Sequence, residues 1–178
     1  MENKESIIIA AVEGGGTSFV VAVAELGEDR VPKILFRSEV DSSHDKPHKT
    51  LDECAAFFQQ HRPKDGYHAL GIATFGPVGL VESRPTYGKI LSGSPKQPWR
   101  NVDFLTPLAK ACRGRLPLAV KVDTDVNAPA FAEYLLAKDK ISSVAYITVG
   151  TGIGVGLVIH GQPVHGRMHP EGGTFAHE

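Results

Sequence analysis

The 178-residue sequence predicts an α/β fold with a mixed sheet. Short apolar runs rich in β-branched residues alternate with segments whose apolar residues recur at helical spacing. A strand, a glycine-rich turn and a second strand occur twice, at residues 7–23 and 144–159. A hydrophobic fraction of 42% is enough for a core, and the length suits one domain or one and a fraction.

The chain is expected to begin with three strands. Residues 6–12 (SIIIAAV) form an apolar run too short for a helix, and residues 19–24 (FVVAVA) resume it after EGGGTS, which predicts a hairpin. Residues 33–40 alternate in polarity, as a third strand would. Residues 50–61 carry apolar residues at helical spacing, and we expect this helix to begin at Thr50 as its N-cap, with a glutamate three places on.

The middle of the chain alternates strands with helices. Residues 69–74 (ALGIAT) predict a strand, and residues 82–99 are rich in Gly, Pro, Ser and Thr, which indicates a long ordered loop. A helix over 101–112, a strand over 118–122 and a helix over 126–136 follow.

The second hairpin is expected over residues 144–149 and 155–160, with GQPV turning the chain again. Between these strands the sequence TVGTGIGVGLV places glycine at every second position, where glycine normally weakens a strand. Without covering helices this hairpin would expose an apolar face.

Composition narrows the function classes. A formal net charge of −1 provides no general field for nucleic acid or an anionic membrane. No apolar segment approaches the roughly 20 residues that span a bilayer, and the N-terminus is unlike a secretory signal. Cys54 and Cys112 lie far apart, so we expect two buried thiols rather than a disulfide or a zinc knot. A cytoplasmic protein is expected.

The glycine turns indicate phosphate recognition. Consecutive glycines allow backbone N–H groups to converge, because left-handed φ costs glycine little and no Cβ blocks close approach. A plain hairpin turn is the alternative, but each turn also carries a threonine hydroxyl. G-x-G-x-x-G before a helix and G-K-[ST] are both absent, which argues against dinucleotide-binding and P-loop folds. Two hairpins closing on a nucleoside triphosphate fit better.

Six segments carry a family resemblance. The sequence resembles the N-terminal part of ROK sugar kinases of the actin-like ATPase superfamily, most closely their fructokinase branch, and this implies the actin-like (ribonuclease H-like) fold. The segments follow family order: AVEGGGTSFV (11–20), ATFGPV (73–78), SPKQPW (94–99), DTDVNAPAFAE (123–133), ITVGTGIGVGLV (147–158) and HPEGG (169–173).

The resemblance implies that Asp125 is the catalytic base. It follows a predicted strand and precedes a helix, a place where open sheets hold ligands. From the residues alone, Asp123 or Asp125 could instead cap the helix; with Asp125 as base, Asp123 or Thr124 would cap it. Glu13 is expected to help hold Mg²⁺ through water, the alternative being a polar strand end.

The resemblance also implies two binding groups. The ATP phosphates would contact Glu13, Gly14, Gly15, Gly16, Thr17, Gly150, Thr151, Gly152 and Gly154. The sugar pocket would be lined by Gly76, Ser94, Thr124 and Glu171. Trp99 is expected to plug the long loop rather than to serve as a sugar platform.

The sequence departs from the family in two places. Serine stands at position 18, where relatives carry a lysine after the first glycine turn. The family's E-x-G-H appears here as Glu171-Gly172-Gly173-Thr174, and no cysteine-rich zinc loop follows. Because His165, His169 and His177 lack thiolate or carboxylate spacing, no metal site is expected. We expect a first lobe over 1–135 and an incomplete second lobe over 136–178.

The resemblance implies an ATP- and Mg²⁺-dependent hexose kinase that converts D-fructose to fructose 6-phosphate. Its partners would be a sugar and ATP, without nucleic acid or membrane, and a homodimer is consistent with the resemblance. Alternatives are a kinase for glucose, mannose or N-acetylmannosamine, and a non-catalytic fragment with residual phosphate or sugar affinity. A sugar-responsive repressor would need a helix-turn-helix module, and the first strand begins too early to leave room for one.

Overall fold

The computed structural model describes residues 6–28, 31–42, 45–149, 152–166 and 171–174. The chain divides into two compact units, Met1–Val122 and Asp123–Glu178, and each is described by itself. The lobe boundary expected at residue 135 remains a prediction.

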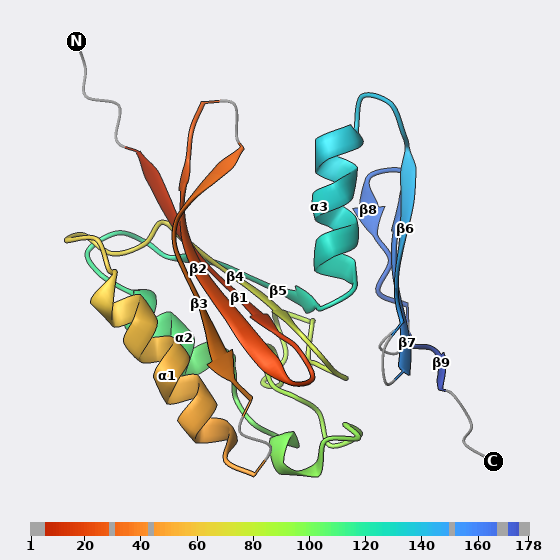
Figure 1. Cartoon of the computed structure of the whole chain (residues 1–178), viewed down its shortest axis with the longest axis horizontal. Helices are drawn as coiled ribbons and strands as arrows, with labels where there is room; N and C mark the ends of the chain where they lie inside the picture. The colour runs from red at the N-terminus through yellow and green to blue at the C-terminus, as the bar shows by residue number, and fades with distance from the viewer. Residues whose placement is uncertain (1–5, 29–30, 43–44, 150–151, 167–170, 175–178) are drawn as a thin grey trace. The chain divides into compact units, whose positions relative to one another are not determined.

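The first unit is built on a five-stranded mixed sheet in the order β3-β2-β1-β4-β5 (Figure 1). Strand β1 pairs antiparallel with β2, which pairs antiparallel with β3, whereas β1 and β4 are parallel. The predicted strands are confirmed, and the last two residues of β5 belong to the second unit. The strands are β1 (Ile7–Gly14), β2 (Ser18–Leu26), β3 (Pro32–Asp41), β4 (Ala69–Thr74) and β5 (Ala119–Thr124).

Two helices, α1 (Pro47–Gln60) and α2 (Leu105–Cys112), pack against each other and lie on one face of this sheet (Figure 1). The core lies between them and the strands, because alternate strand residues point toward the helices. Among the described residues, no helix has the length and apolarity needed to cross a membrane. The largest fully buried side chains are Trp99, Tyr67, Phe19, Phe58, Phe104, Leu51, Leu70, Ile90 and Leu108.

Both helices of the first unit begin at different residues from those predicted. Helix α1 starts at Pro47, whose fixed φ suits a first helical position, and the Thr50 hydroxyl donates to the Asp41 carbonyl oxygen at 3.2 Å instead of capping. Helix α2 starts four residues later than predicted, at Leu105. Asn101 has a left-handed φ of 62°, which interrupts helical geometry, and Asp103 accepts hydrogen bonds from the Thr106 N–H and hydroxyl.

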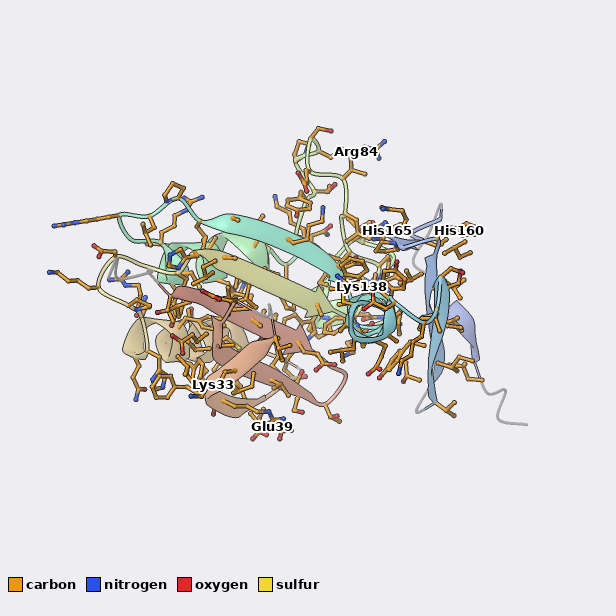
Figure 2. All side chains as sticks on the ribbon, turned by 90° about the horizontal axis from the view of Figure 1, so that it is seen from above. Lys33, Glu39, Arg84, Lys138, His160 and His165 are labelled. Carbon is orange, nitrogen blue, oxygen red and sulfur yellow. The ribbon has the colours of Figure 1, made fainter. Side chains whose placement is uncertain are left out.

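The long loop predicted between β4 and α2 is ordered by short-range pairing. Val78 bridges to Ile90, and Gly88 takes a left-handed φ of 72° where a Cβ would lie 2.5 Å from the Leu105 side chain. The short 3-10 helix η1 (Gln97–Trp99) closes the loop. Figure 2 shows Arg84 at its outer end.

Strand β3 forms one edge of the sheet, and its side chains are mostly exposed. Lys33 and Glu39 project from this strand (Figure 2). Charged side chains on an edge strand discourage pairing with another chain.

In the described part of the second unit, the helix α3 (Asn127–Ala137) packs against a small antiparallel sheet (Figure 1). The predicted hairpin is confirmed as β6 paired with β7. Strand β7 also pairs with β8, and the turn between them has φ of 47° at His160 and 78° at Gly161, the two positive values of a tight hairpin turn. Strand β9 pairs with β7 and was not predicted. The strands are β6 (Ser143–Val149), β7 (Gly152–Ile159), β8 (Gln162–Pro163) and β9 (Glu171–Thr174).

The hairpin exposes the apolar face that the sequence predicts. Ile147 and Val149 on β6 are 61% and 68% exposed, and Ile159 on β7 is 47% exposed. Alternation places Ile147 and Val149 on the same face of the strand.

Candidate active site

The first glycine turn joins β1 to β2 and is fixed by backbone hydrogen bonds. The Gly15 N–H donates to the Ser18 carbonyl oxygen at 3.0 Å, and the Phe75 N–H donates to the Gly14 carbonyl oxygen at 3.0 Å. Because β1 and β4 are parallel neighbours, this turn lies where their carboxyl ends meet. Gly16 and Thr17 are exposed, so the turn is open to a ligand from solvent.

Close packing, rather than left-handed backbone, explains two glycines of this turn. A Cβ on Gly14 would lie 2.9 Å from Thr74 Oγ1 and 3.0 Å from the Phe19 ring, and one on Gly15 would lie 2.9 Å from the Ser18 carbonyl oxygen. None of Gly14, Gly15 and Gly16 has φ in the left-handed region. The expected conformational reason for glycine is therefore wrong here, and the expected close approach of a phosphate to this turn remains a prediction.

The other candidate residues of the first unit lie near the same ends of β1 and β4 or in the long loop. Glu13 is exposed on β1, next to Ala73 of β4 in the parallel register. Gly76 is buried directly after β4, in a cis peptide bond with Pro77. Ser94 is fully buried in the loop, and its hydroxyl accepts from the Lys96 N–H at 3.3 Å. Their roles in binding remain predictions.

An aromatic cluster holds the loop against the sheet. Trp99 is 1% exposed and stacks on Phe19 with ring centroids 5.2 Å apart. Phe75 meets the Trp99 ring edge-on at 5.4 Å, and Phe104 stacks on Phe19 at 5.5 Å. The interpretation of Trp99 as a structural plug is therefore confirmed.

Lys96 is a residue at this turn that the sequence interpretation missed. Its Nζ donates to the carbonyl oxygens of Gly16 at 3.1 Å and Gly15 at 3.3 Å, and it lies 3.6 Å from the centroid of the Phe75 ring. The segment SPKQPW contains this lysine, but no local pattern relates it to a turn 80 residues earlier.

In the second unit, Asp125 occupies the two-residue turn between β5 and α3 and is half-buried. Thr124, the residue before Asp125, supports the start of α3, because its Oγ1 accepts a hydrogen bond from the Asn127 N–H at 2.9 Å. Asp123 Oδ1 accepts from the Thr124 N–H at 2.7 Å. The N-cap position of α3 is Val126, and Thr124 supplies the side-chain acceptor for the first helical N–H. The catalytic role of Asp125 remains a prediction.

Asn127 joins α3 to the sheet of the second unit. Its fully buried amide donates from Nδ2 to the Val164 carbonyl oxygen and accepts at Oδ1 from the Leu157 N–H, both at 3.1 Å. These bonds hold the start of α3 against β7 and the segment after β8. Asn127 lies in the segment DTDVNAPAFAE, but no role was predicted for it from the sequence.

The glycines of β7 lie under this helix start. A Cβ on Gly156 would lie 2.0 Å from the Val126 carbonyl oxygen, and one on Gly154 would lie 2.8 Å from Val126 Cγ1. Helix packing therefore requires a bare backbone at Gly156, where the obstacle is backbone, and leaves little room for a Cβ at Gly154, where the obstacle is a side chain. The phosphate role expected for Gly154 remains a prediction. Packing against α3 is a second explanation for a glycine at this position.

Asp123 also contacts a histidine. Nε2 of His165 lies 3.0 Å and 3.1 Å from the two carboxylate oxygens, and the Asp123 side chain is 15% exposed. His165 therefore has a hydrogen-bonded partner, and His169 and His177 lie outside the described residues. Within the described ranges, no group of three His, Cys, Asp or Glu residues is placed to hold a metal ion.

The two cysteines are in the core of the first unit, as predicted. Burial raises the pKa of both the Cys54 and the Cys112 thiol to about 12.

Several candidate residues are only partly described. Gly150 and Thr151 lie outside the described residues, and Gly152 is the first residue of β7. Glu171 begins β9, where its backbone pairs with Gly154. The proposed meeting of the two glycine turns remains a prediction, because they belong to separate units.

Comparisons with known proteins agree with this description. The model of the ROK family matches residues 9–177. The chain is 38% identical to a fructokinase of Zymomonas mobilis over 97% of its length and 54% of that protein, and 34% identical to a putative fructokinase of Bacillus subtilis, covering 93% and 51%. The chain thus spans about half the length of these relatives. A ROK glucokinase of Streptomyces griseus, solved with glucose and AMPPNP, has a similar fold (TM-score 0.64, 24% identity, 98% of this chain and 50% of that one).

Proposed function

The chain belongs to the ROK family, and from this premise we propose that it transfers the γ-phosphoryl group of ATP to a hexose hydroxyl. Fructose is the proposed acceptor and fructose 6-phosphate the product. The names of the matched relatives favour fructose over glucose, mannose and N-acetylmannosamine.

The position of Asp125 is the observation that carries the proposal. This carboxylate is half-buried at the carboxyl end of β5, while the neighbouring Thr124 hydroxyl already accepts from the start of α3. In the proposed reaction Asp125 accepts the proton of the attacking sugar hydroxyl. Thr124 and Ser94, both fully buried, would orient the sugar.

The residues of the first turn fit the phosphates and their cation. Bound ATP supplies the γ-phosphoryl group, and Mg²⁺ neutralises charge on its phosphates. Glu13 presents an exposed carboxylate at the end of β1, and carboxylate oxygens are the ligands that Mg²⁺ prefers. The exposed turn at Gly16 and Thr17 offers backbone N–H groups and a hydroxyl to phosphate oxygens.

The test measures ADP formation by the purified chain with Mg²⁺, ATP and each of the four hexoses. We expect fructose to give the highest kcat/KM, and Asp125→Asn to lower kcat by at least about 100-fold. Asp123→Asn is the matched control: it makes the same chemical change two residues away, and we expect it to retain most activity.

A non-catalytic phosphate- or sugar-binding fragment is the second candidate, because the chain spans about half the length of its relatives. Binding of fructose or Mg²⁺·ATP without turnover in the unaltered chain would support this candidate and contradict the first. Equal loss of activity in Asp123→Asn and Asp125→Asn would contradict the specific assignment of Asp125 as base.

A further inference from the structure

The first glycine turn contains no cation of its own. Residues 13–18 read EGGGTS, so the only charge within the turn sequence is negative. The positive charge at this turn comes from Lys96, whose Nζ lies 3.1 Å from the Gly16 carbonyl oxygen and 3.3 Å from that of Gly15. A residue of the long loop thus completes a turn located 80 residues earlier.

The ammonium group of Lys96 is held in place before any ligand arrives. It lies 3.6 Å from the centroid of the buried Phe75 ring, which packs edge-on against Trp99 at 5.4 Å. The Lys96 N–H also donates to the Ser94 hydroxyl at 3.3 Å. An ordered side chain loses less conformational entropy when a ligand binds, so it binds more tightly than a mobile one.

The contacts with Gly15, Gly16 and Phe75 orient the ammonium group of Lys96. The carbonyl oxygens and the aromatic ring are neutral groups, so they orient the ammonium without cancelling its positive charge. The two carbonyl oxygens carry partial negative charge that would repel a phosphate, and the ammonium offsets it. Gly16 and Thr17 are exposed, so a phosphate can reach the turn from solvent.

We propose that Lys96 binds the transferring phosphoryl group at the first glycine turn. This inference rests on the proposed kinase function and adds to it a phosphate-binding residue from the long loop. Lys96 contacts both the turn, through Gly15 and Gly16, and Ser94, a predicted sugar residue. From that place the ammonium would stabilise negative charge as it moves from ATP to the sugar oxygen.

The alternative is that Lys96 only clamps the loop to the turn. The test uses the full chain and measures binding of tripolyphosphate and of Mg²⁺·ATP by calorimetry. Lys96→Met keeps a long apolar side chain and removes the charge; we expect roughly tenfold or greater loss of affinity for both ligands and a weaker dependence on salt. Lys96→Arg retains the charge but changes the geometry of the cation over the Phe75 ring, so we expect a smaller loss of affinity than in Lys96→Met.

A rescue variant separates binding from clamping. Position 18 follows the turn and lies opposite Asp41 on β3, so a lysine there is compatible with the strand pair. In the Lys96→Met background, Ser18→Lys is expected to recover part of the lost affinity, because Asp41 opposite it would also attract the new ammonium group. Fluorescence of Trp99, the single tryptophan, checks that the loop keeps its packing in each variant.

The possible results are distinct. Unchanged affinity in Lys96→Met, with or without a lower melting temperature, overturns the assignment of Lys96 and leaves the kinase proposal standing. If Lys96→Met disrupts the loop, equal loss of affinity in a folded Lys96→Arg overturns a role based on charge. If the unaltered chain binds neither ligand, both this inference and the proposed function of the chain are overturned.

Discussion

Gly156→Ala should destabilise the second unit far more than an alanine on a strand normally does. A Cβ at this position would lie 2.0 Å from the Val126 carbonyl oxygen and 2.9 Å from the Asn127 nitrogen. Both atoms belong to the backbone at the start of α3, so no side-chain rotation can relieve the contact. The helix start must move away from β7.

The size of the effect follows from this displacement. An ordinary contact begins near 3.4 Å, so the Val126 carbonyl must retreat by 3.4 − 2.0 = 1.4 Å. The two Asn127 hydrogen bonds, both 3.1 Å long, would then be broken. Overpacking costs about 1–3 kcal/mol, and the two hydrogen bonds contribute about 1 kcal/mol each. Replacing a strand glycine with alanine stabilises the folded state by about 0.5–1 kcal/mol. The net decrease in the free energy of unfolding is therefore about 2–4 kcal/mol.

Hydrogen exchange followed by mass spectrometry measures this loss locally. Peptides from α3, β6 and β7 should exchange roughly 30- to 700-fold faster, the ratio that corresponds to about 2–4 kcal/mol. Gly71→Ala on β4 is the matched control, because its Cβ would meet nothing within 4 Å. Gly154→Ala should lie between the two, since its Cβ would meet the movable Val126 side chain at 2.8 Å. Wild-type exchange in Gly156→Ala would refute the packing explanation.

Three further predictions concern the core and the exposed hairpin. The contribution of the Cys54 and Cys112 thiols to the free energy of unfolding should fall as pH rises from 9.0 toward about 12, because the unfolded thiols release protons that the folded thiols retain. In urea titrations, a Cys54→Ala, Cys112→Ala double variant should lose part of this alkaline slope, and an unchanged slope would assign it to other groups. Trp99→Ala should lower the free energy of unfolding by about 3–5 kcal/mol, measured by urea denaturation followed by circular dichroism. Trp99→Phe should lower it less, since the indole N–H has no hydrogen-bond partner among the described residues. Equal losses in the two variants would contradict the packing role of Trp99. Ile147→Lys should reduce binding of a hydrophobic dye and raise solubility without lowering the melting temperature, since this side chain is 61% exposed; a clear drop in melting temperature would show that Ile147 is packed in solution.

Local sequence determined most of the strands. Apolar runs such as residues 69–74 matched their strands because period-two burial and β-branched side chains favour an extended chain. The helix starts were less accurate. Thr50 and Asn101 both have side chains that often cap helices, but Pro47 provides an earlier start for α1 and the left-handed backbone of Asn101 delays α2.

The sequence by itself determined the mixed α/β class, the two glycine hairpins, the buried cysteines and the position of Asp125 between a strand and a helix. Each of these depends on neighbours within a few residues or on composition. Only the tertiary structure decided that Lys96 reaches Gly15 and Gly16, and that Val126 requires Gly156 to be bare. Those contacts join residues 30 or more positions apart, and their geometry depends on how whole elements pack, which no local periodicity encodes.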